Sequence, residues 1–329
     1  MILLPTPKQL EVFEERFVLR YDAYIVLEDG CSLLHRRQAF LLQKKIEEST
    51  GLALHLTAGK ARAGDILLRY DPQMDAQPES YAIEIGRQGV VLAGSEQGLL
   101  WAIQTFCQIL GQYGCCLPQL RLQDAPSLPY RGYYHDVTRG RVPTLRFLKQ
   151  LADKLSEYKL NQMQLYIENT YLFRDFSEVW RSDDPLTPEE IIELDDYCYE
   201  RGIELVPSIS TFSHLYQVLR TRQFSYLCEL ENSCDDPFDA WDKQDHHTID
   251  ITNPDSSPFV CRMIDEYRPL FRTRLFNLCA DETFDLGLGR SQEYCRQVGK
   301  DTAYVGFVKK LCNHLIEKGC RPMMWGDII

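Results

Sequence analysis

The chain has 329 residues, 44% of them apolar, and a formal net charge of -12 at pH 7. This length suggests about two domains, each large enough to bury a hydrophobic core. The negative charge argues against a surface for nucleic acids or anionic membranes, because binding phosphate groups requires clustered Lys and Arg side chains. A neutral or cationic small ligand fits the charge better.

The start of the chain and its cysteines bear on the cell compartment. The opening residues, MILLPTPKQLEVFEERF, show no basic region before an apolar one and no small-residue cleavage site, and no window of the sequence reaches transmembrane length. We therefore predict a cytoplasmic protein. The 12 cysteines are scattered and include no CxxC pair. Reduced thiols are predicted rather than a disulfide framework, and no metal site is expected.

The first 125 residues alternate strand-like and helical patterns. Strands are predicted at residues 24–27, 66–69, 81–85 and 90–93, a hairpin turn at Arg87-Gln88-Gly89, and helices at residues 33–48 and 98–110. This pattern predicts a small α+β domain. Residues 123–129, QDAPSLP, are rich in Pro and polar residues, so we place the domain boundary there. The predicted domains are residues 1–125 and 126–329.

From Arg131 onward, short apolar runs alternate with helical stretches, which is typical of βα units and a parallel sheet. The predicted strands are residues 132–136, 162–168, 204–210, 275–281 and 322–327. Five units in sequence favour an α/β fold of the (β/α)8 TIM-barrel type over a doubly wound sheet, but a barrel needs eight units. We therefore expect an incomplete catalytic barrel that lacks about three units, either an engineered truncation or a natural fragment.

Polar side chains end the predicted strands. In a TIM barrel the active site lies at the carboxyl ends of the strands, so these side chains are the candidate site residues. They are Asp136, Glu168, Ser210 with His214, Asp281 with Glu282, and Trp325 with Asp327. Several carboxylates are therefore expected at one mouth of the barrel.

Asp281 and Glu282 directly follow the apolar run Leu278-Cys279-Ala280. Ionised groups at the point where a strand leaves the core need a partner or a function, although an ordinary polar loop start is the alternative. Paired carboxylates are the usual machinery of sugar hydrolysis, but adjacent residues are too close to act from opposite sides of a sugar. Strand alternation is expected to make the two side chains diverge, so a group of the substrate would have to supply the nucleophile.

Three histidines and a tryptophan have two interpretations each. His214 can hydrogen-bond an acid at the mouth and tune it, or it can be a solvated loop histidine. Trp325 can stack against a sugar or an N-acetyl methyl group, or it can belong to the core at the barrel top. His246 and His247 look like a metal pair, but adjacent histidines rarely ligate one ion and no third ligand is spaced nearby, so we expect no metal there.

Three motifs stand together in this sequence: Tyr130-Arg131-Gly132 with Asp136 and Arg139, then Lys159-Leu160-Asn161, then the Asp281-Glu282 pair. Together they resemble glycoside hydrolase family 20, the β-N-acetylhexosaminidases. The resemblance covers nearly the whole chain, with the first 125 residues similar to the non-catalytic α+β domain of that family and the remainder similar to its catalytic barrel as far as the fifth strand. The strings at residues 178–181, 207–215 and 281–289 resemble a signal-less, intracellular bacterial branch.

The resemblance implies an exo-acting enzyme that removes terminal non-reducing β-linked GlcNAc or GalNAc by substrate-assisted retaining hydrolysis. The 2-acetamido carbonyl attacks C1 and forms an oxazolinium-type intermediate, and no cofactor is required. Asp281 would orient the acetamido group and stabilise its developing positive charge. Glu282 would protonate the leaving oxygen and later activate water.

The resemblance also implies the substrate-binding residues. Arg131 matches the arginine that holds the 3- and 4-hydroxyls of the sugar, a role suited to a fixed fork of donors. His214 matches the histidine near the acid, and Trp325 matches one wall of the acetamido pocket. Glu168, an acid at a strand end, is counted among the substrate-binding residues. The expected partner is a small molecule or oligosaccharide with a terminal N-acetylhexosamine, and neither nucleic acid nor a membrane.

The sequence departs from the family pattern at several positions. Many relatives carry His-x-Gly-Gly before the acid pair, whereas this chain has Asn277-Leu278-Cys279-Ala280. An acid often found four residues before the histidine is Ser210 here, and a His with a paired Asp at the second strand end is replaced by Tyr166, Glu168 and Asn169. The pocket and the tuning of the acid are therefore expected to differ. Because the remaining pocket residues of the family come from later strands, the chain as given is expected to be inactive.

Two other classes of function are weighed against this one. A non-catalytic glycan-binding or scaffold barrel would bind sugar without hydrolysis. A metal-dependent barrel hydrolase would use His135, His214 and Asp281, but no His-x-His follows the first strand. The motifs fit GlcNAc and GalNAc equally well and predict no oligomeric state.

Overall fold

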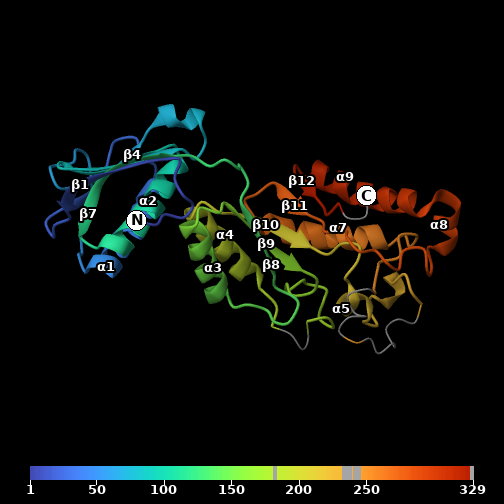
Figure 1. Cartoon of the computed structure of the whole chain (residues 1–329). Coiled ribbons are helices and arrows are strands. Elements are labelled where there is room, and N and C mark those ends of the chain that lie inside the picture. Colours follow the sequence, from blue (N-terminus) through green and yellow to red (C-terminus); the bar gives the residue numbers. More distant parts are fainter. Residues whose placement is uncertain (181–183, 232–238, 240–245, 327–329) are drawn as a thin grey trace. The chain divides into compact units, whose positions relative to one another are not determined.

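The structure is a computed structural model of the chain (Figure 1), and it describes all residues except 181–183, 232–238, 240–245 and 327–329. The chain divides into two compact units. The first unit comprises Met1–Arg131, Gln150–Asn161 and Cys198–Ile203. The second comprises Gly132–Lys149, Gln162–Tyr197 and Glu204–Ile329. The first unit thus includes two short segments from beyond residue 126.

The first unit is built on a mixed sheet of seven strands among the described residues, in the order β1-β7-β5-β6-β4-β2-β3. The strands are β1 (Gln9–Val18), β2 (Tyr24–Leu27), β3 (His55–Ala58), β4 (Ile66–Tyr70), β5 (Tyr81–Gly86), β6 (Gly89–Gly94) and β7 (Cys116–Asp124). Strands β2, β3, β4 and β6 pair in parallel, whereas β1, β5 and β7 pair antiparallel. A short 3-10 helix, η1 (Pro72–Ala76), lies between β4 and β5.

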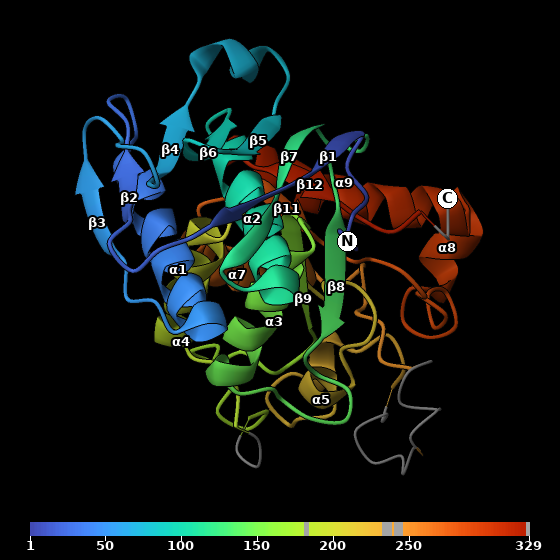
Figure 2. The same ribbon diagram turned by 60° about the vertical axis from the view of Figure 1, so that its left-hand side comes forward.

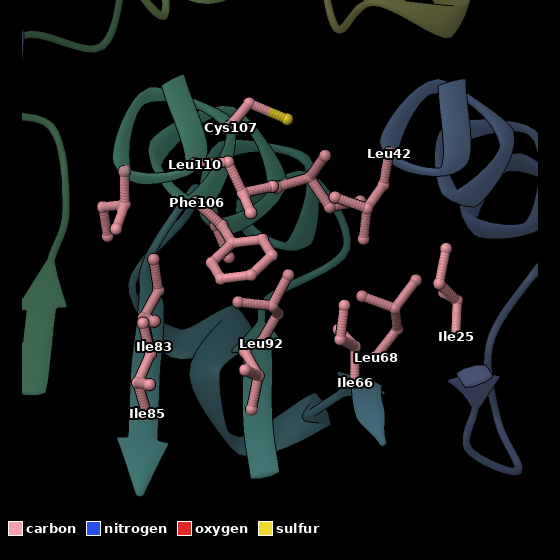
Figure 3. Close-up of a cluster of buried hydrophobic side chains, with 14 of the residues drawn as sticks. Ile25, Leu42, Ile66, Leu68, Ile83, Ile85, Leu92, Phe106, Cys107 and Leu110 are labelled. Carbon is pink, nitrogen blue, oxygen red and sulfur yellow. The ribbon is translucent and has the colours of Figure 1, made fainter. Parts of the chain in front are cut away.

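Two helices, α1 (Leu33–Thr50) and α2 (Gly98–Tyr113), lie side by side against this sheet (Figure 2). Figure 3 shows Leu42 of α1 and Phe106 and Leu110 of α2 among the aliphatic side chains of the strands. The strand residues in this core include Ile25, Ile66, Leu68, Ile83, Ile85 and Leu92. Each buried aliphatic side chain of this size stabilises the fold by about 1.5–3 kcal/mol, which explains why the period-2 and period-3.6 patterns identify these elements.

The elements predicted in the first unit are confirmed, and three strands were missed. Strand β2 has the predicted bounds, and both helices extend a few residues beyond theirs. Strands β1 and β3 lie at the two edges of the sheet and are mostly exposed, so they lack the apolar alternation that predicts a strand. Strand β7 contains Pro118, which argues against a strand in a sequence-based prediction.

The second unit contains a parallel sheet of five strands within the described residues, in the order β12-β11-β10-β9-β8. The strands are β8 (Gly132–Asp136), β9 (Gln162–Ile167), β10 (Glu204–Ile209), β11 (Leu275–Asn277) and β12 (Arg321–Met323). All four pairings are parallel and join strands that are consecutive in the chain. This is the strand order of a TIM barrel, so the predicted fold class is confirmed, and the five strands form an open sheet.

Helices alternate with these strands. They are α3 (Leu145–Glu157), α4 (Pro188–Glu200), α5 (Tyr216–Leu219), α7 (Ser256–Tyr267), α8 (Gln292–Val298) and α9 (Lys300–Glu317), with short 3-10 turns η2 (Ser225–Leu227) and η4 (Arg268–Leu270). Figure 1 shows α9 running alongside α7 and next to β12. Among the helices that the structure describes, none has the length and apolar character needed to cross a membrane.

One face of the parallel sheet carries a chain of hydrogen-bonded polar side chains. Asn277 donates to Gln164, whose own amide donates to Gln162, at 3.1 Å in each case. Gln162 in turn donates to Glu204 at 3.3 Å. In the strand register Gln162 is level with Glu204, and Asn277 is level with Ser208, so this chain of side chains runs obliquely across β9, β10 and β11. The buried amides are therefore satisfied within the sheet.

Candidate active site

The Asp281-Glu282 pair lies in a turn that follows β11. The strand ends at Asn277, and Cys279, Ala280 and Glu282 have left-handed backbone conformations with φ of 57°, 62° and 44°. The expectation that strand alternation separates the two carboxylates is therefore wrong. Each left-handed residue other than glycine costs about 1–2 kcal/mol, so the surrounding structure must hold this turn in place.

Three hydroxyl groups donate to three of the backbone carbonyls of this turn. Thr211 Oγ1 donates to the carbonyl of Leu278 at 2.6 Å, and Tyr304 Oη donates to that of Ala280 at 2.7 Å. Ser213 Oγ donates to the carbonyl of Asp281. We call these three side chains the hydroxyl frame. Thr211 and Ser213 follow β10 and Tyr304 belongs to α9, so two separate parts of the unit fix the backbone that carries the acid pair.

His214 lies next to both acids. Its side chain is buried, and its Nε2 atom lies 3.3 Å from Glu282 Oε2 and 4.0 Å from Asp281 Oδ2. The interpretation of His214 as a solvated loop residue is therefore wrong. The Glu282 side chain is 48% exposed and that of Asp281 is 23% exposed. Glu282 is thus the more accessible of the two carboxylates.

A second charged cluster, formed by Asp136, Arg139, Tyr166 and Glu168, lies at the ends of β8 and β9. Arg139 Nη2 lies 3.1 Å from Glu168 Oε1, which also accepts a 2.9 Å hydrogen bond from Tyr166 Oη. Asp136 Oδ1 accepts from the backbone nitrogens of Thr138 and Arg139, both at 2.9 Å. These bonds fix the turn that presents the Arg139 guanidinium, which remains 40% exposed.

Electrostatics places this cluster near the acid pair. Burial raises the pKa of Glu168 to about 7, Arg139 and the Tyr166 hydroxyl oppose that rise, and the Asp281 charge adds to it. The Glu282 charge likewise contributes to a raised Arg139 pKa. The carboxyl ends of β8, β9 and β10 and the β11 turn therefore bring together four carboxylates, one histidine and one arginine.

Aromatic and weakly polar side chains from β8, β10 and the β11 turn pack next to these charged groups. Tyr134 Oη lies 3.1 Å from Ser208 Oγ, which lies 3.3 Å from Cys279 Sγ. The Tyr134 ring packs edge-on against Trp325, with ring centroids 5.0 Å apart. Burial raises the pKa of the Cys279 thiol to about 12, so the thiol is neutral and is not a nucleophile. Trp325 remains partly exposed, as a wall of a pocket would be.

The structure does not bring Arg131 to this site. Arg131 precedes β8, whereas Asp136 ends it, so the two residues lie at opposite ends of the strand. Its guanidinium pairs with Glu79 and donates to the backbone carbonyls of Leu128 and Lys159, both at 2.8 Å, within the first unit. The assignment of Arg131 to substrate hydroxyls is therefore wrong. The misleading signal was the Tyr-Arg-Gly motif, because Arg139 is the arginine at the carboxyl end.

The remaining candidates have other contacts. The His135 ring stacks on Tyr133 and approaches Phe147, and burial lowers the His135 pKa. His246 Nδ1 lies 2.9 Å from Asp285 Oδ1, and His247 packs edge-on against Tyr216. Within the described ranges no three His, Cys, Asp or Glu side chains form a group that could hold a metal ion. Asp327 lies outside the described residues.

Parallel βα units with acids at the carboxyl ends of their strands are the arrangement of a TIM-barrel active site. Family models agree with this geometry: "Glycosyl hydrolase family 20, domain 2" matches residues 1–125, and "Glycosyl hydrolase family 20, catalytic domain" matches residues 128–329. The chain belongs to glycoside hydrolase family 20.

Curated relatives share modest identity with the chain. A lacto-N-biosidase from Bifidobacterium bifidum is 25% identical over 303 residues, covering 87% of this chain and 26% of the relative. A beta-hexosaminidase from Vibrio furnissii is 25% identical over 350 residues, covering 95% of this chain and 54% of the relative. The chain thus spans about half or less of the length of these proteins.

Solved structures share the fold. A Flavobacterium johnsoniae chitobiase superposes with a TM-score of 0.82 at 20% identity, over 99% of this chain and 52% of that one. A GH20 β-N-acetylhexosaminidase from Streptomyces coelicolor gives a TM-score of 0.82 at 20% identity, over 98% of this chain and 66% of that one. Both match a small α+β unit followed by barrel strands.

Proposed function

We propose that the protein is an exo-acting β-N-acetylhexosaminidase that removes terminal non-reducing β-linked GlcNAc or GalNAc by substrate-assisted retaining hydrolysis. The observation that carries the proposal is the Asp281-Glu282 turn. The half-exposed Glu282 carboxylate lies next to the buried His214 ring, and the Asp281 carboxylate lies 4.0 Å from the same ring. No cofactor is required for this chemistry. The cytoplasmic location stays a prediction from the sequence.

The reaction follows from two carboxylates that cannot lie on opposite sides of the sugar. The carbonyl oxygen of the substrate's own 2-acetamido group attacks C1 while Glu282 donates its proton to the leaving oxygen, so the glycosidic bond breaks and an oxazolinium ion forms. Asp281 orients the acetamido N–H and stabilises its positive charge. In the second step Glu282 takes a proton from water, the water oxygen attacks C1, and the acetamido group is regenerated.

Substrate binding is assigned to the second charged cluster. The exposed Arg139 guanidinium has donors available for sugar hydroxyls, and Glu168 holds it in place from one side. Trp325 supplies an apolar face for the acetamido methyl group. This proposal keeps Glu168 and Trp325 as substrate-binding residues and replaces Arg131 with Arg139.

The test compares release of 4-methylumbelliferone from its β-GlcNAc and β-glucose conjugates by the full-length protein and by its Glu282→Gln variant. Hydrolysis of the acetamido substrate alone, reduced by about 10²–10⁴-fold in the variant, is the expected result. Equal rates on the glucoside would overturn the substrate-assisted mechanism. Binding of GlcNAc without turnover would favour the glycan-binding alternative.

A further inference from the structure

The loop of residues 283–291 directly follows Glu282 and contains a buried carboxylate, Asp285. Asp285 Oδ2 accepts from the backbone nitrogens of His247, at 2.8 Å, and Thr248, at 3.4 Å. Its Oδ1 lies 2.9 Å from His246 Nδ1. A side chain of the loop thus binds the backbone of residues 247–248 and the ring of His246, although nearly forty residues separate them in the chain.

A second buried carboxylate, Glu229, binds the same loop at its C-terminal end. Its Oε1 accepts from the backbone nitrogen of Gly289, at 3.0 Å, and from both the nitrogen and the hydroxyl of Ser291, at 3.0 and 2.7 Å. The backbone carbonyl of Glu229 also accepts from the nitrogen of Arg290 at 2.9 Å. Residues 289–291 are therefore tied to Glu229 by both its side chain and its backbone.

The two attachments are joined to each other. The backbone nitrogen of Glu229 donates to the carbonyl of Thr248 at 2.9 Å, and Cys228 forms a β-bridge with Ile249. The hydrogen bonds therefore form a closed circuit from Asp285 through residues 247–248 and Glu229 back to residues 289–291. At the start of this circuit, the nitrogen of Phe284 donates to the carbonyl of Glu282 at 2.8 Å.

Burying two carboxylates is costly unless their charge is well solvated by donors. Burial raises the pKa of Glu229, while the donors from Ser291 and Gly289 lower it. Hydrogen bonds to an ionised acceptor are shorter and stronger than neutral ones, so this arrangement rigidifies a loop more than packing alone would.

We infer that Asp285 and Glu229 are positioning residues for the general acid, an inference that rests on the proposed function. They fix the loop that begins at Glu282, and so they set where the Glu282 carboxyl lies relative to the leaving oxygen. Attack by the acetamido group does not depend on this loop. Loss of an anchor therefore slows substrates whose leaving group needs a proton and spares substrates whose leaving group does not.

The experiment uses alanine variants, conservative variants and a matched control in the full-length protein. Asp285→Ala and Glu229→Ala remove the acceptors. Asp285→Asn and Glu229→Gln keep one oxygen that can accept the same backbone N–H groups. Asp250→Ala is the control, because Asp250 is buried close by and, among the described residues, its carboxylate is hydrogen-bonded to the nitrogen and hydroxyl of Thr252 in its own turn and not to the loop. The Asp250 charge adds to the raised pKa of Glu229, so this variant removes an electrostatic effect on Glu229 without removing a hydrogen bond of the circuit.

Two rates and one structural readout are measured. The rates are kcat/KM for the 2,4-dinitrophenyl β-GlcNAc conjugate, which needs no protonation, and for N,N'-diacetylchitobiose, which does. Amide hydrogen exchange at residues 283–291 reports whether the loop has loosened. We expect the alanine variants to lose about 10²-fold on the disaccharide and little on the aryl substrate, with faster exchange in the loop. The conservative variants recover most of the disaccharide rate.

Equal losses on both substrates, or a loosened loop with an unchanged disaccharide rate, would overturn the positioning role while the proposed function stands. The same selective loss in Asp250→Ala would also overturn it, since that change removes no hydrogen bond of the circuit. A wild-type protein that hydrolyses neither substrate would overturn the proposed function instead.

Discussion

Two arginine–glutamate pairs in this molecule have the same residue types and differ in the protein groups that surround them. In the first unit, Arg131 and Glu79 are 17% and 13% exposed. The other donors of Arg131 go to backbone carbonyls, and Glu79 also accepts from Trp101 at 2.7 Å and Asn161 at 3.0 Å. In the second unit, Arg139 is 40% exposed and faces Glu168, which is 15% exposed.

The difference in exposure separates a structural pair from the pair proposed to bind substrate. The Arg131 pair is enclosed by protein groups that use its hydrogen-bonding capacity, so it ties residue 79 to residues 159–161 and has little left for a ligand. The Arg139 pair keeps donors at the surface, where sugar hydroxyls can reach them. Residue type alone does not distinguish the two, whereas the saturation of the donors does.

The largest expected effect tests this contrast directly. Arg139→Ala should lower kcat/KM for the acetamido substrate by about 10- to 100-fold, because it removes the hydrogen bonds proposed to the substrate. It should cost less stability than Arg131→Ala, because Glu168, with its pKa of about 7, can take up a proton when its partner is lost. Arg131→Ala should instead lower the free energy of unfolding by about 3–5 kcal/mol, because Glu79 stays buried without its partner. Steady-state kinetics and urea unfolding of both variants give the result, and the reverse pattern would refute the comparison.

The second prediction concerns the pH dependence that Glu168 causes. Its pKa is about 7 in the folded protein against 4.5 ordinarily, so the folded state binds more protons between these values. Stability should therefore fall as pH rises from about 4.5 to about 7, by up to about 3 kcal/mol. Glu168→Gln should remove this decline. Unfolding free energies of both proteins across this range provide the measurement, and parallel curves would contradict it.

The third prediction concerns a buried lysine of the first unit, which makes stability rise with pH where Glu168 makes it fall. Burial lowers the Lys159 pKa from 10.5 to about 8, and in the described part of the chain its amine makes no hydrogen bond and lies over the Tyr81 ring. The unfolded state then binds more protons, so stability rises from about pH 8 to about pH 10.5. Lys159→Met should stabilise the protein at pH 7 by about 2 kcal/mol. Thermal unfolding at pH 7 and pH 10 should show the gain only at the lower pH.

The smallest expected effect compares one hydroxyl from each unit. Tyr304→Phe removes the donor to the Ala280 carbonyl, and Tyr81→Phe removes the donor to Asp124. Each should cost about 1 kcal/mol of stability. Only Tyr304→Phe should also reduce kcat, since it alone holds the turn of the acid pair. Equal kcat values for the two variants would argue against a role for the hydroxyl frame.

Much of the fold was predictable because apolar periodicity identifies buried elements. The runs at residues 132–136 and 162–168 correspond closely to β8 and β9, whereas the run at 275–281 was too long, since β11 ends at Asn277. Cys279 and Ala280, near the end of this run, are apolar and buried, yet their left-handed backbone is incompatible with a strand. A run of apolar residues indicates burial, and it does not distinguish a buried strand from a buried turn.

Site residues at the ends of strands could be predicted from the sequence. Residues that act through contacts between distant loops could not. Asp281, Glu282 and His214 lie together as the sequence reasoning expected. Glu229 and Asp285 gave no signal, because their partners are backbone groups far away in the chain. Arg131 was misassigned because a motif records which residues recur together, and it does not record which end of a strand each one occupies.

The hydroxyl frame has a consequence for how the protein matures. The Ala280 carbonyl receives its hydrogen bond from Tyr304, and the Leu278 carbonyl receives one from Thr211, 67 positions earlier. During synthesis, therefore, the strained turn can be held by Thr211 and Ser213 but lacks the hydrogen bond to the Ala280 carbonyl until α9 has emerged and docked. The geometry of the acid pair is complete only after a helix that begins 18 residues after Glu282 has folded, and a chain in which α9 has not docked would carry both carboxylates without their working geometry.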